Sequence, residues 1–202
     1  MNVKQTKLAI LLLAAGQGSR LGNIPKALLK KEGTPLIQHF WHELSALNPI
    51  ESVSVLGFYA EQIEPLAKQY SRVVINQQAD KGHASSVRLG LESLHTNFDL
   101  LLIALVDQPR ITQASIELLL NAFEAQGEEV DALVPTYQGQ RGNPILMRRR
   151  AVLEIVNTPE QVCRSWLDKN PHRVCFYETQ QDEFVVDIDT LDDLQKEVLF
   201  LP

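Results

Sequence analysis

The continuous apolar run Leu8–Ala14, which ends at a glycine-rich loop, constrains the fold of this chain more than any other feature. A strand of a parallel sheet is covered by helices on both faces, so it is apolar throughout rather than alternating. The run is too short to span a bilayer. No small-x-small cleavage pattern follows it, which argues against a secretion signal. The run therefore predicts a buried strand of a parallel sheet.

Strand-like and helix-like segments alternate along the rest of the chain. The expected strands are Ser52–Leu56, Arg72–Ile75, Leu100–Val106, Ala132–Pro135, Pro144–Met147, Val174–Tyr177 and Phe184–Asp187. The expected helices are Pro35–Leu47, Ala60–Tyr70, Ser85–Leu94, Gln113–Ala125, Arg150–Val156, Glu160–Asp168 and Leu191–Val198, with Thr112 and Thr190 as helix caps. This alternation predicts an α/β fold, a three-layer α/β/α sandwich around a mainly parallel sheet, to which the closely spaced strands after Leu133 add an antiparallel part.

Composition narrows the possible partners. The chain has 202 residues, of which 45% are hydrophobic and 22% charged, and it shows no long linker or repeat, so we expect a single domain over residues 1–202. The net charge of −6 argues against nucleic-acid binding, and we expect no membrane partner. Cys163 and Cys175 are too far apart for a CxxC pair, as expected for a cytoplasmic protein.

The loop after the first strand has the features of a phosphate-binding site. Gly16, Gly18 and Gly22 are spaced as GxGxxxG, one residue longer than the dinucleotide fingerprint, and the second strand lacks the acidic residue of that fingerprint. No GxxxxGK[ST] motif is present. Glycines let backbone N–H groups converge on an anion, and Arg20 and Lys26 add positive charge. The loop therefore predicts phosphate binding.

Carboxylates follow two later segments. Asp107 ends the apolar run Leu100–Val106, and parallel pairing would bring it to the same sheet edge as the glycine loop. Asp187 and Asp189 would share one face of an extended segment. Mg²⁺ prefers one or two carboxylates together with phosphate oxygens, so Asp107 with either of these two predicts a metal site. Asp189 could instead only cap the last helix.

Two further stretches carry polar residues suited to a pocket. Residues Asp80–Ser86 precede a helix, where free N–H groups and hydroxyls could contact a base or ribose, although Ser85 could equally be a helix cap. Residues Arg141–Pro144 form a turn with one cation.

Taken in order, these motifs resemble a known family. L-A-A-G-Q-G-S-R-L-G-N-I-P-K is followed by G-H-A-S-S-V-R-L-G-L, V-D-Q-P, R-G-N-P-I-L and D-I-D-T-L-D-D-L. Together they resemble the MobA-like nucleotidyltransferases, most closely the molybdenum cofactor cytidylyltransferase branch, over about Leu8 to Leu194. The resemblance implies a Rossmann-like nucleotidyltransferase fold.

The resemblance also assigns roles by position. It places Arg20 and Lys26 on the triphosphate, Asp107 and Asp189 on Mg²⁺, and makes Arg20, Lys26 and Asp107 the catalytic residues. The A-A-G form of the loop goes with cytidine nucleotides in this family, so Ala15 points to CTP. The remaining implied nucleotide-binding residues are Leu13, Ala14, Gly16, Gly18, Ser19, Asp80, Gly82, Ser85 and Ser86, and the acceptor side would hold Arg141, Gly142, Asn143 and Pro144.

The implied activity is transfer of CMP from CTP to a small phosphate-bearing acceptor, with pyrophosphate released and Mg²⁺ as cofactor. Members specific for molybdopterin carry G-D-x-G-A-R after the R-G-x-P strand, whereas residues 157–165 here keep only Arg164, so the acceptor stays open. Rival interpretations are a guanylyltransferase using GTP, a sugar-phosphate nucleotidyltransferase, an oxidoreductase and a non-catalytic nucleotide-binding module. A monomer or a small homo-oligomer is expected.

Overall fold

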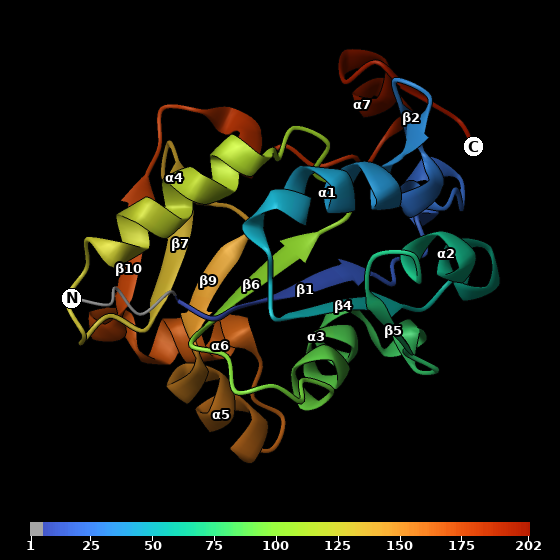
Figure 1. Ribbon diagram of the computed structural model, residues 1–202. Helices are drawn as coiled ribbons and strands as arrows, with labels where there is room; N and C mark the ends of the chain where they lie inside the picture. Colours follow the sequence, from blue (N-terminus) through green and yellow to red (C-terminus); the bar gives the residue numbers. More distant parts are fainter. Residues whose placement is uncertain (1–5) are drawn as a thin grey trace.

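A computed structural model describes residues 6–202, and its centre is a large, mainly parallel sheet (Figure 1). Within these residues the sheet has eight strands in the order β10-β7-β9-β6-β1-β4-β5, with β8 beside β7. The strands are β1 (Leu8–Ala14), β4 (Glu51–Leu56), β5 (Arg72–Ile75), β6 (Leu100–Leu105), β7 (Ala132–Tyr137), β8 (Gln140–Arg141), β9 (Ile145–Arg148) and β10 (Val174–Glu178).

Strand β1 lies near the middle of the sheet, parallel to β4 on one side and to β6 on the other. Strand β9 runs antiparallel to both β6 and β7, and β8 is antiparallel to β7. The predicted mixed sheet is thus confirmed, with its antiparallel part after Leu133. Because β1 and β6 are parallel neighbours, the loops that follow them emerge at the same edge.

Helices cover both faces of the sheet (Figure 1). One face carries α1 (Leu36–Leu44), α2 (Ala60–Ala67) and α4 (Gln113–Glu124), and the other carries α3 (His83–Glu92), α5 (Arg149–Asn157) and α6 (Cys163–Lys169). Thr112 caps α4 as predicted.

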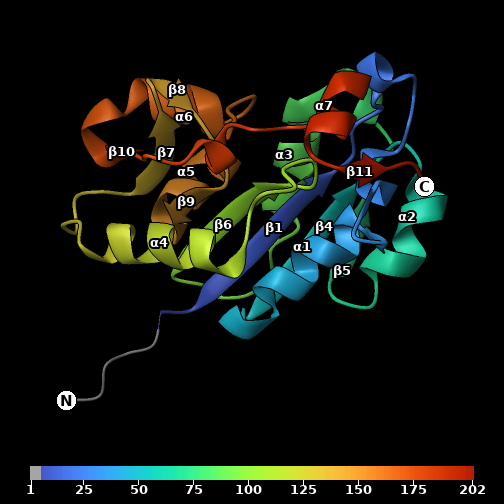
Figure 2. The ribbon, with the colours of Figure 1, turned by 90° about the horizontal axis from the view of Figure 1, so that it is seen from above.

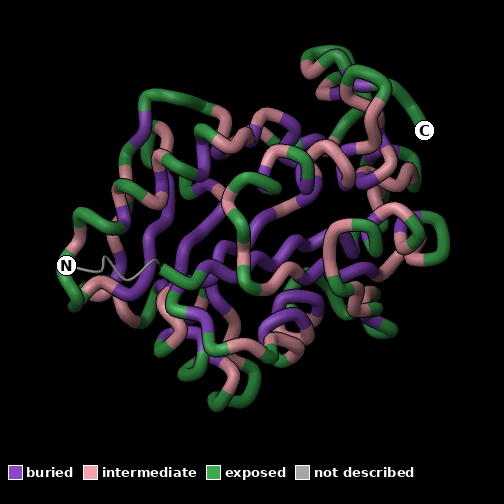
Figure 3. The backbone as a smooth tube through the Cα atoms, viewed as in Figure 1, coloured by how far each residue is buried: buried purple, intermediate pink, exposed green. Residues whose placement is uncertain are grey.

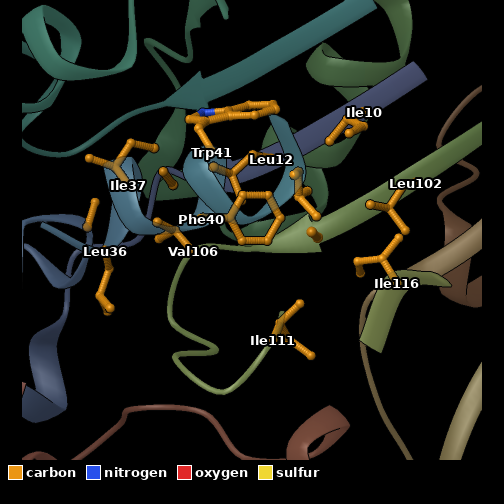
Figure 4. Packing of buried hydrophobic residues seen from close by; sticks show 14 of the residues in the cluster. Ile10, Leu12, Leu36, Ile37, Phe40, Trp41, Leu102, Val106, Ile111 and Ile116 are labelled. Atoms are coloured by element: carbon orange, nitrogen blue, oxygen red, sulfur yellow. The ribbon is translucent and has the colours of Figure 1, made fainter. Parts of the chain in front are cut away.

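The even and odd residues of β1 separate into the two halves of the core. Ile10 and Leu12 belong to the cluster that contains Phe40 and Trp41 of α1 (Figure 4), whereas Leu11 packs on the opposite side with α3, α5 and α6. Every residue of β1 is buried, and the buried segments in Figure 3 follow the central strands. The apolar run therefore behaves as the sequence predicts.

A second, small sheet lies beside the carboxyl end of β1 (Figure 2). It consists of β2 (Lys30–Lys31), β3 (Thr34–Pro35) and β11 (Leu199–Phe200), all antiparallel, and helix α7 (Leu191–Lys196) precedes β11. Thr190 caps α7 as predicted. Sequence patterning misses this sheet because strands of two residues carry no periodicity.

One expected strand is wrong. Residues 184–187 form no strand: Asp182–Phe184 make a short 3₁₀ turn, and the chain then continues without a ladder partner. The carbonyl of Phe184 accepts hydrogen bonds from Gln108 Nε2 at 2.9 Å and from the Asn143 amide at 2.8 Å. Phe184 is buried, so it gives the segment a strand-like pattern, but its backbone binds loops and side chains rather than a neighbouring strand.

Several helices are shorter than their patterns suggest. Helix α1 ends at Leu44 and continues as a 3₁₀ turn over Ser45–Leu47, and α2 ends at Ala67. Over residues 6–202 no helix is long and apolar enough to cross a membrane. The proposed single domain over residues 1–202 includes residues 1–5, which lie outside the described part of the chain.

Candidate functional site

A cavity of about 750 Å³ opens at the carboxyl ends of β1 and β6. This is the edge where open α/β sheets bind their ligands. Most of the predicted site residues line it, from the glycine loop, from the start of α3 and from the two carboxylate segments. They are Leu13, Ala14, Ala15, Gly16, Gly18, Ser19, Arg20, Lys26, Asp80, Gly82, Ser86, Asp107 and Asp189.

Two glycines of the loop have different roles in its backbone. Gly18 has a φ of 67°, and a Cβ there would lie 2.3 Å from the carbonyl oxygen of Ile24. A Cβ on Gly16 would meet nothing within 4 Å, so the backbone at this position is open to a ligand. The Tyr59 hydroxyl donates to the carbonyls of Gln17, at 3.1 Å, and Asn23, at 2.5 Å. The loop is therefore fixed from one side and accessible from the other.

Charged side chains from distant parts of the chain meet at the cavity. Lys26 Nζ donates to Asp107 Oδ2 at 2.8 Å and to Asp189 Oδ1 at 2.7 Å. Arg20 Nη1 donates to the other oxygen of Asp189 at 2.7 Å. The side chain of Lys26 is 14% exposed and that of Arg20 is 77% exposed. We call Arg20, Lys26, Asp107 and Asp189 the cavity cluster.

The pKa values of the cavity cluster follow from these contacts. Burial works against the charge on Lys26, but the charge of Asp107 and the hydrogen bonds to both carboxylates outweigh it and raise the pKa of Lys26. The hydrogen bond from Lys26 lowers the pKa of Asp189. Burial raises the pKa of the neighbouring Asp187, and the charges of Asp107 and Asp189 add to this rise. At neutral pH the lysine is therefore an ammonium between two carboxylates.

The structure distinguishes Asp189 from Asp187. Asp189 contacts both cations and lines the cavity, whereas Asp187 is absent from the cavity lining. The alternative that Asp189 serves only as a helix cap does not hold, because Thr190 is the cap of α7 and its hydroxyl accepts from the Asp193 amide. Instead, Asp193 accepts from the Asp189 amide at 3.1 Å and so fixes that backbone.

Contacts outside the cavity tie its three charged segments together. Lys31 Nζ donates to the carbonyl of Pro109 at 2.7 Å, which links the chain after Lys26 to the chain after Asp107. Arg110 forms a two-pronged ion pair with Glu197, at 2.8 and 2.6 Å, which links the chain after Asp107 to the chain after Asp189. Each segment is thus joined to the others a few residues beyond its cavity residue.

The start of α3 is organised by Asn76, which is buried. Its side-chain amide donates to the hydroxyls of Ser85 and Ser86, both at 2.9 Å. Ser86 lines the cavity, but Ser85 does not, because its hydroxyl turns back to the carbonyls of Gly82 and Gln78. Of these two predicted site residues, only Ser86 therefore faces the cavity.

A second cavity of about 650 Å³ lies next to the first. Arg141, Gly142 and Asn143 of the predicted acceptor side line it, whereas Pro144 does not. Leu13, His83 and Leu105 line both cavities. His83 belongs to the motif G-H-A-S-S and is the first residue of α3, a position at a helix start that is the one sequence signal for a role in the site.

The residues of the cavity suit a magnesium ion that takes most of its coordinating oxygens from a bound phosphate ligand and water. No group of three or more His, Cys, Asp or Glu side chains within residues 6–202 is arranged as a protein-only metal site. Mg²⁺ commonly takes one or two carboxylates and completes its shell with phosphate oxygens and water. Asp107 and Asp189 already place carboxylate oxygens around one positive charge, the Lys26 ammonium, so the donor set fits such an ion.

The family model of the MobA-like NTP transferase domain matches residues 10–174. The chain therefore belongs to the MobA-like NTP transferase family, which confirms the resemblance drawn from its motifs.

Two relatives illustrate the range of this similarity. The chain is 30% identical over 193 residues to the nicotine blue oxidoreductase of Paenarthrobacter nicotinovorans, a match that covers 92% of this chain and 93% of the relative. It is 31% identical over 153 residues to the bifunctional protein GlmU of Streptococcus equi subsp. zooepidemicus, covering 75% of this chain. That match takes in only 33% of the GlmU chain.

Solved structures share the fold. Rv0371c of Mycobacterium tuberculosis H37Rv has a TM-score of 0.79 at 22% identity, with 96% of this chain and 98% of that chain covered. A manganese complex of Rv0371c gives a TM-score of 0.72 at 20% identity, covering 95% and 98%. A CMP:2-keto-3-deoxy-manno-octonic acid synthetase complexed with CTP gives a TM-score of 0.70 at 14% identity, covering 95% and 96%. The predicted Rossmann-like nucleotidyltransferase fold is therefore confirmed.

Proposed function

We propose that this chain transfers CMP from CTP to a small phosphate-bearing acceptor and releases pyrophosphate. The observation that carries the proposal is the convergence of Lys26, Asp107 and Asp189 beside an open glycine loop in one cavity. Two cations and an accessible backbone suit a triphosphate, and two carboxylates suit the metal that accompanies it.

The chain's own residues act by binding and positioning. The amides of the glycine loop and the guanidinium of Arg20 hold the β- and γ-phosphates, and Lys26 lies where negative charge grows as pyrophosphate departs. A phosphate monoester has a second pKa of about 6, so the acceptor is already a strong anion near neutral pH and requires no general base. Catalysis then rests on alignment and on charge neutralisation.

Asp107 and Asp189 would hold Mg²⁺. When bound, the ion supplies positive charge to the phosphate oxygens of the nucleotide. On this proposal the Lys26 ammonium, which both carboxylates bind in the free protein, turns toward the phosphates as the nucleotide enters.

Preference for cytidine is proposed from Ala15. Ala15 is buried, its carbonyl accepts from the Phe58 amide at 3.4 Å, and a Cβ on Gly57 would lie 2.9 Å from its methyl group. Ala15 is therefore held in place in the cavity lining, and on this proposal its methyl group takes space that a purine would need. Gly82, Ser86 and Asp80 complete this end of the cavity and are proposed to contact the base and ribose.

Release of pyrophosphate from the four common NTPs tests the proposal, with molybdopterin and sugar phosphates offered as acceptors in the presence of Mg²⁺. Transfer of radiolabel from [α-³²P]CTP, and much less from [α-³²P]GTP, is the expected result. Labelling from GTP alone would overturn the cytidine assignment and support a guanylyltransferase. Tight CTP binding without turnover on any acceptor would support a nucleotide-binding module.

An oxidoreductase is the second candidate, because the relative with that name matches nearly the whole chain. The glycine spacing and the missing acidic residue of the dinucleotide fingerprint count against it. Titration with NAD(P)H and flavins separates the two candidates. Micromolar binding of either cofactor, with no binding of CTP, would replace the transferase proposal.

A further inference from the structure

Three residues line both cavities and form the wall between them, and only one of the three has a polar side chain. Leu13 and Leu105 contribute aliphatic groups, and His83 contributes an imidazole. An acceptor in the second cavity would reach the α-phosphorus of a nucleotide in the first cavity across this wall. Among the residues that line both cavities, His83 is the one whose side chain can hydrogen-bond to a ligand in either of them.

His83 is free to bind a ligand. Its side chain is exposed, and within residues 6–202 it makes no hydrogen bond, in contrast to His42, which binds the Tyr70 hydroxyl at 2.7 Å. Although His83 is exposed, the protein around the ring still excludes part of its water, which lowers the pKa of the His83 ring, and the charge of Asp107 offsets only part of this. At neutral pH the ring is then mostly neutral, with one nitrogen as donor and the other as acceptor.

The second cavity differs from the first in its lining. Four aliphatic side chains line it, Val134, Ile103, Ile145 and Leu167, and we call them the aliphatic wall; two cations, Arg141 and Arg164, also belong to its lining. Arg141 is already paired with Asp168 and stacked 4.8 Å from the centre of the Phe176 ring. The cavity therefore offers a ligand an aliphatic surface, and Arg164, which forms no ion pair within residues 6–202, offers a charge to an anionic group.

We propose that the acceptor lies in the second cavity with an apolar part against this aliphatic wall, and that His83 aligns its phosphate by donating a hydrogen bond. This inference rests on the proposed transferase function and names a catalytic residue and an acceptor class for it. An oxygen of the acceptor phosphate attacks the α-phosphorus of CTP, and a new P–O bond forms. The bond to the bridging oxygen of the β-phosphate breaks, pyrophosphate leaves with the electron pair, and His83 keeps its proton.

Calorimetry with stable analogues tests the inference. The protein is first saturated with Mg²⁺ and α,β-methylene CTP, which cannot be cleaved, and phenyl phosphate is then titrated as an acceptor probe with an apolar body. Glucose 1-phosphate is the comparison probe with a polar body. The variants are His83→Ala and His83→Gln, and His172→Ala is the control because His172 is exposed and lines neither cavity.

We expect phenyl phosphate to bind more tightly than glucose 1-phosphate. His83→Ala should weaken phenyl phosphate about tenfold, the effect of losing one hydrogen bond to a charged group, with the nucleotide analogue bound as in wild type. His83→Gln, which keeps an N–H donor, should stay within about threefold of wild type. In wild type, the ring-nitrogen resonances of His83 should shift on addition of phenyl phosphate, while those of His172 should not.

Equal affinity of wild type and His83→Ala for phenyl phosphate would overturn the role of His83, as would loss of nucleotide binding in that variant. Tighter binding of glucose 1-phosphate would overturn the apolar acceptor class. Failure of wild type to bind α,β-methylene CTP would overturn the proposed function together with this inference, a result distinguishable from the others.

Discussion

Charged clusters lie at both ends of the parallel strands, and they differ in whether protein groups alone surround the charges or a cavity leaves them open to a ligand. At the amino ends, Asp131 is 0% exposed and accepts from Arg150 and Arg173, and Arg173 also pairs with Glu154. We call these residues the anchoring cluster. At the carboxyl ends, the cavity cluster faces a large open volume, and Arg20 there is mostly in water.

The comparison separates charge used for the fold from charge available to a ligand. In the anchoring cluster the backbone also takes part, because the Asp131 amide donates to the Arg173 carbonyl at 2.8 Å and the Asp131 carbonyl accepts from the Arg148 amide at 2.7 Å. Every partner there belongs to the protein. In the cavity cluster, cations and carboxylates hold one another on a surface that a ligand can reach, so they can exchange partners at lower cost.

The strongest test of this comparison is the removal of Lys26 or Asp107. Lys26→Ala and Asp107→Ala should each reduce turnover about a thousandfold, because each removes charge aimed at the reacting phosphates. The free energy of unfolding should fall by less than in Asp131→Ala, because the partner left unpaired faces the cavity and can be reached by water. Pyrophosphate release and urea denaturation measure the two effects. Lys68→Ala, an exposed lysine paired with Glu64, is the control, and near-normal rates in both site variants would contradict the assignment.

The opposite pattern is expected for the anchoring cluster. Asp131→Ala leaves two arginines without their buried partner and should lower the free energy of unfolding by about 3–5 kcal/mol. The fraction that remains folded should bind CTP as wild type does. Urea denaturation and calorimetry give the two values, and a variant that kept its stability but lost CTP binding would remove the distinction between the clusters.

Glu51 also lies at the amino ends of the strands, and its charge should make the stability of this end of the molecule depend on pH. Although burial opposes its charge, hydrogen bonds from Thr96 and Arg72 lower the pKa of Glu51 to about 2 from an ordinary 4.5. The ionised Glu51 therefore stabilises the fold fully above pH 4.5, the pKa it has in the unfolded chain, and this stabilisation is lost as the pH falls from 4.5 toward 2.

Glu51→Gln should lower the free energy of unfolding by about 2 kcal/mol at pH 7. The difference between variant and wild type should shrink steadily below pH 4.5. Denaturation curves at several pH values measure this, and a difference that is independent of pH would show that the carboxylate charge is not what stabilises this corner.

The smallest effect is expected at Arg20, the exposed member of the cavity cluster. Arg20→Ala should raise the KM for the nucleotide about threefold with little change in kcat, because exposed ion pairs contribute weakly. High salt should reduce the difference from wild type, since exposed charges are screened. A loss as large as that of Lys26→Ala would place Arg20 on the reacting atoms rather than at the mouth of the cavity.

Much of the fold follows from the sequence because its central strands are buried on both faces. Strand β1 begins and ends at the predicted residues, since a continuous apolar run between turns leaves little choice. The edge strand β5 also has the predicted bounds, although its first and last residues are exposed. The strand predicted at Phe184 is wrong, because an apolar side chain can be buried by an irregular loop as well as by a strand. Pairings of two residues, as in β2 and β11, depend on tertiary contacts alone.

Most of the candidate site also follows from the sequence. The glycine loop and Asp107 come together because parallel neighbours share an edge, which topology alone dictates. The residue pattern alone leaves Asp187 and Asp189 equivalent, and only the resemblance favours Asp189, because the position of each depends on how the chain crosses that edge after Phe184. The sequence places His83 at the start of a helix but does not show that it lies between two cavities, because that depends on the tertiary structure.

The pairing of β11 with β2 has a consequence for ligand affinity. Lys26 and Asp189 are 163 positions apart in the sequence, yet Lys26 lies four residues before β2 and Asp189 ten residues before β11. The pairing closes this long loop, so the two side chains meet at a high effective concentration and little further chain entropy is lost. Any change that separates Leu199 from Lys31 would lower the effective concentration of Asp189 at the cavity. Ligand affinity would then fall although every side chain in the cavity lining stays the same.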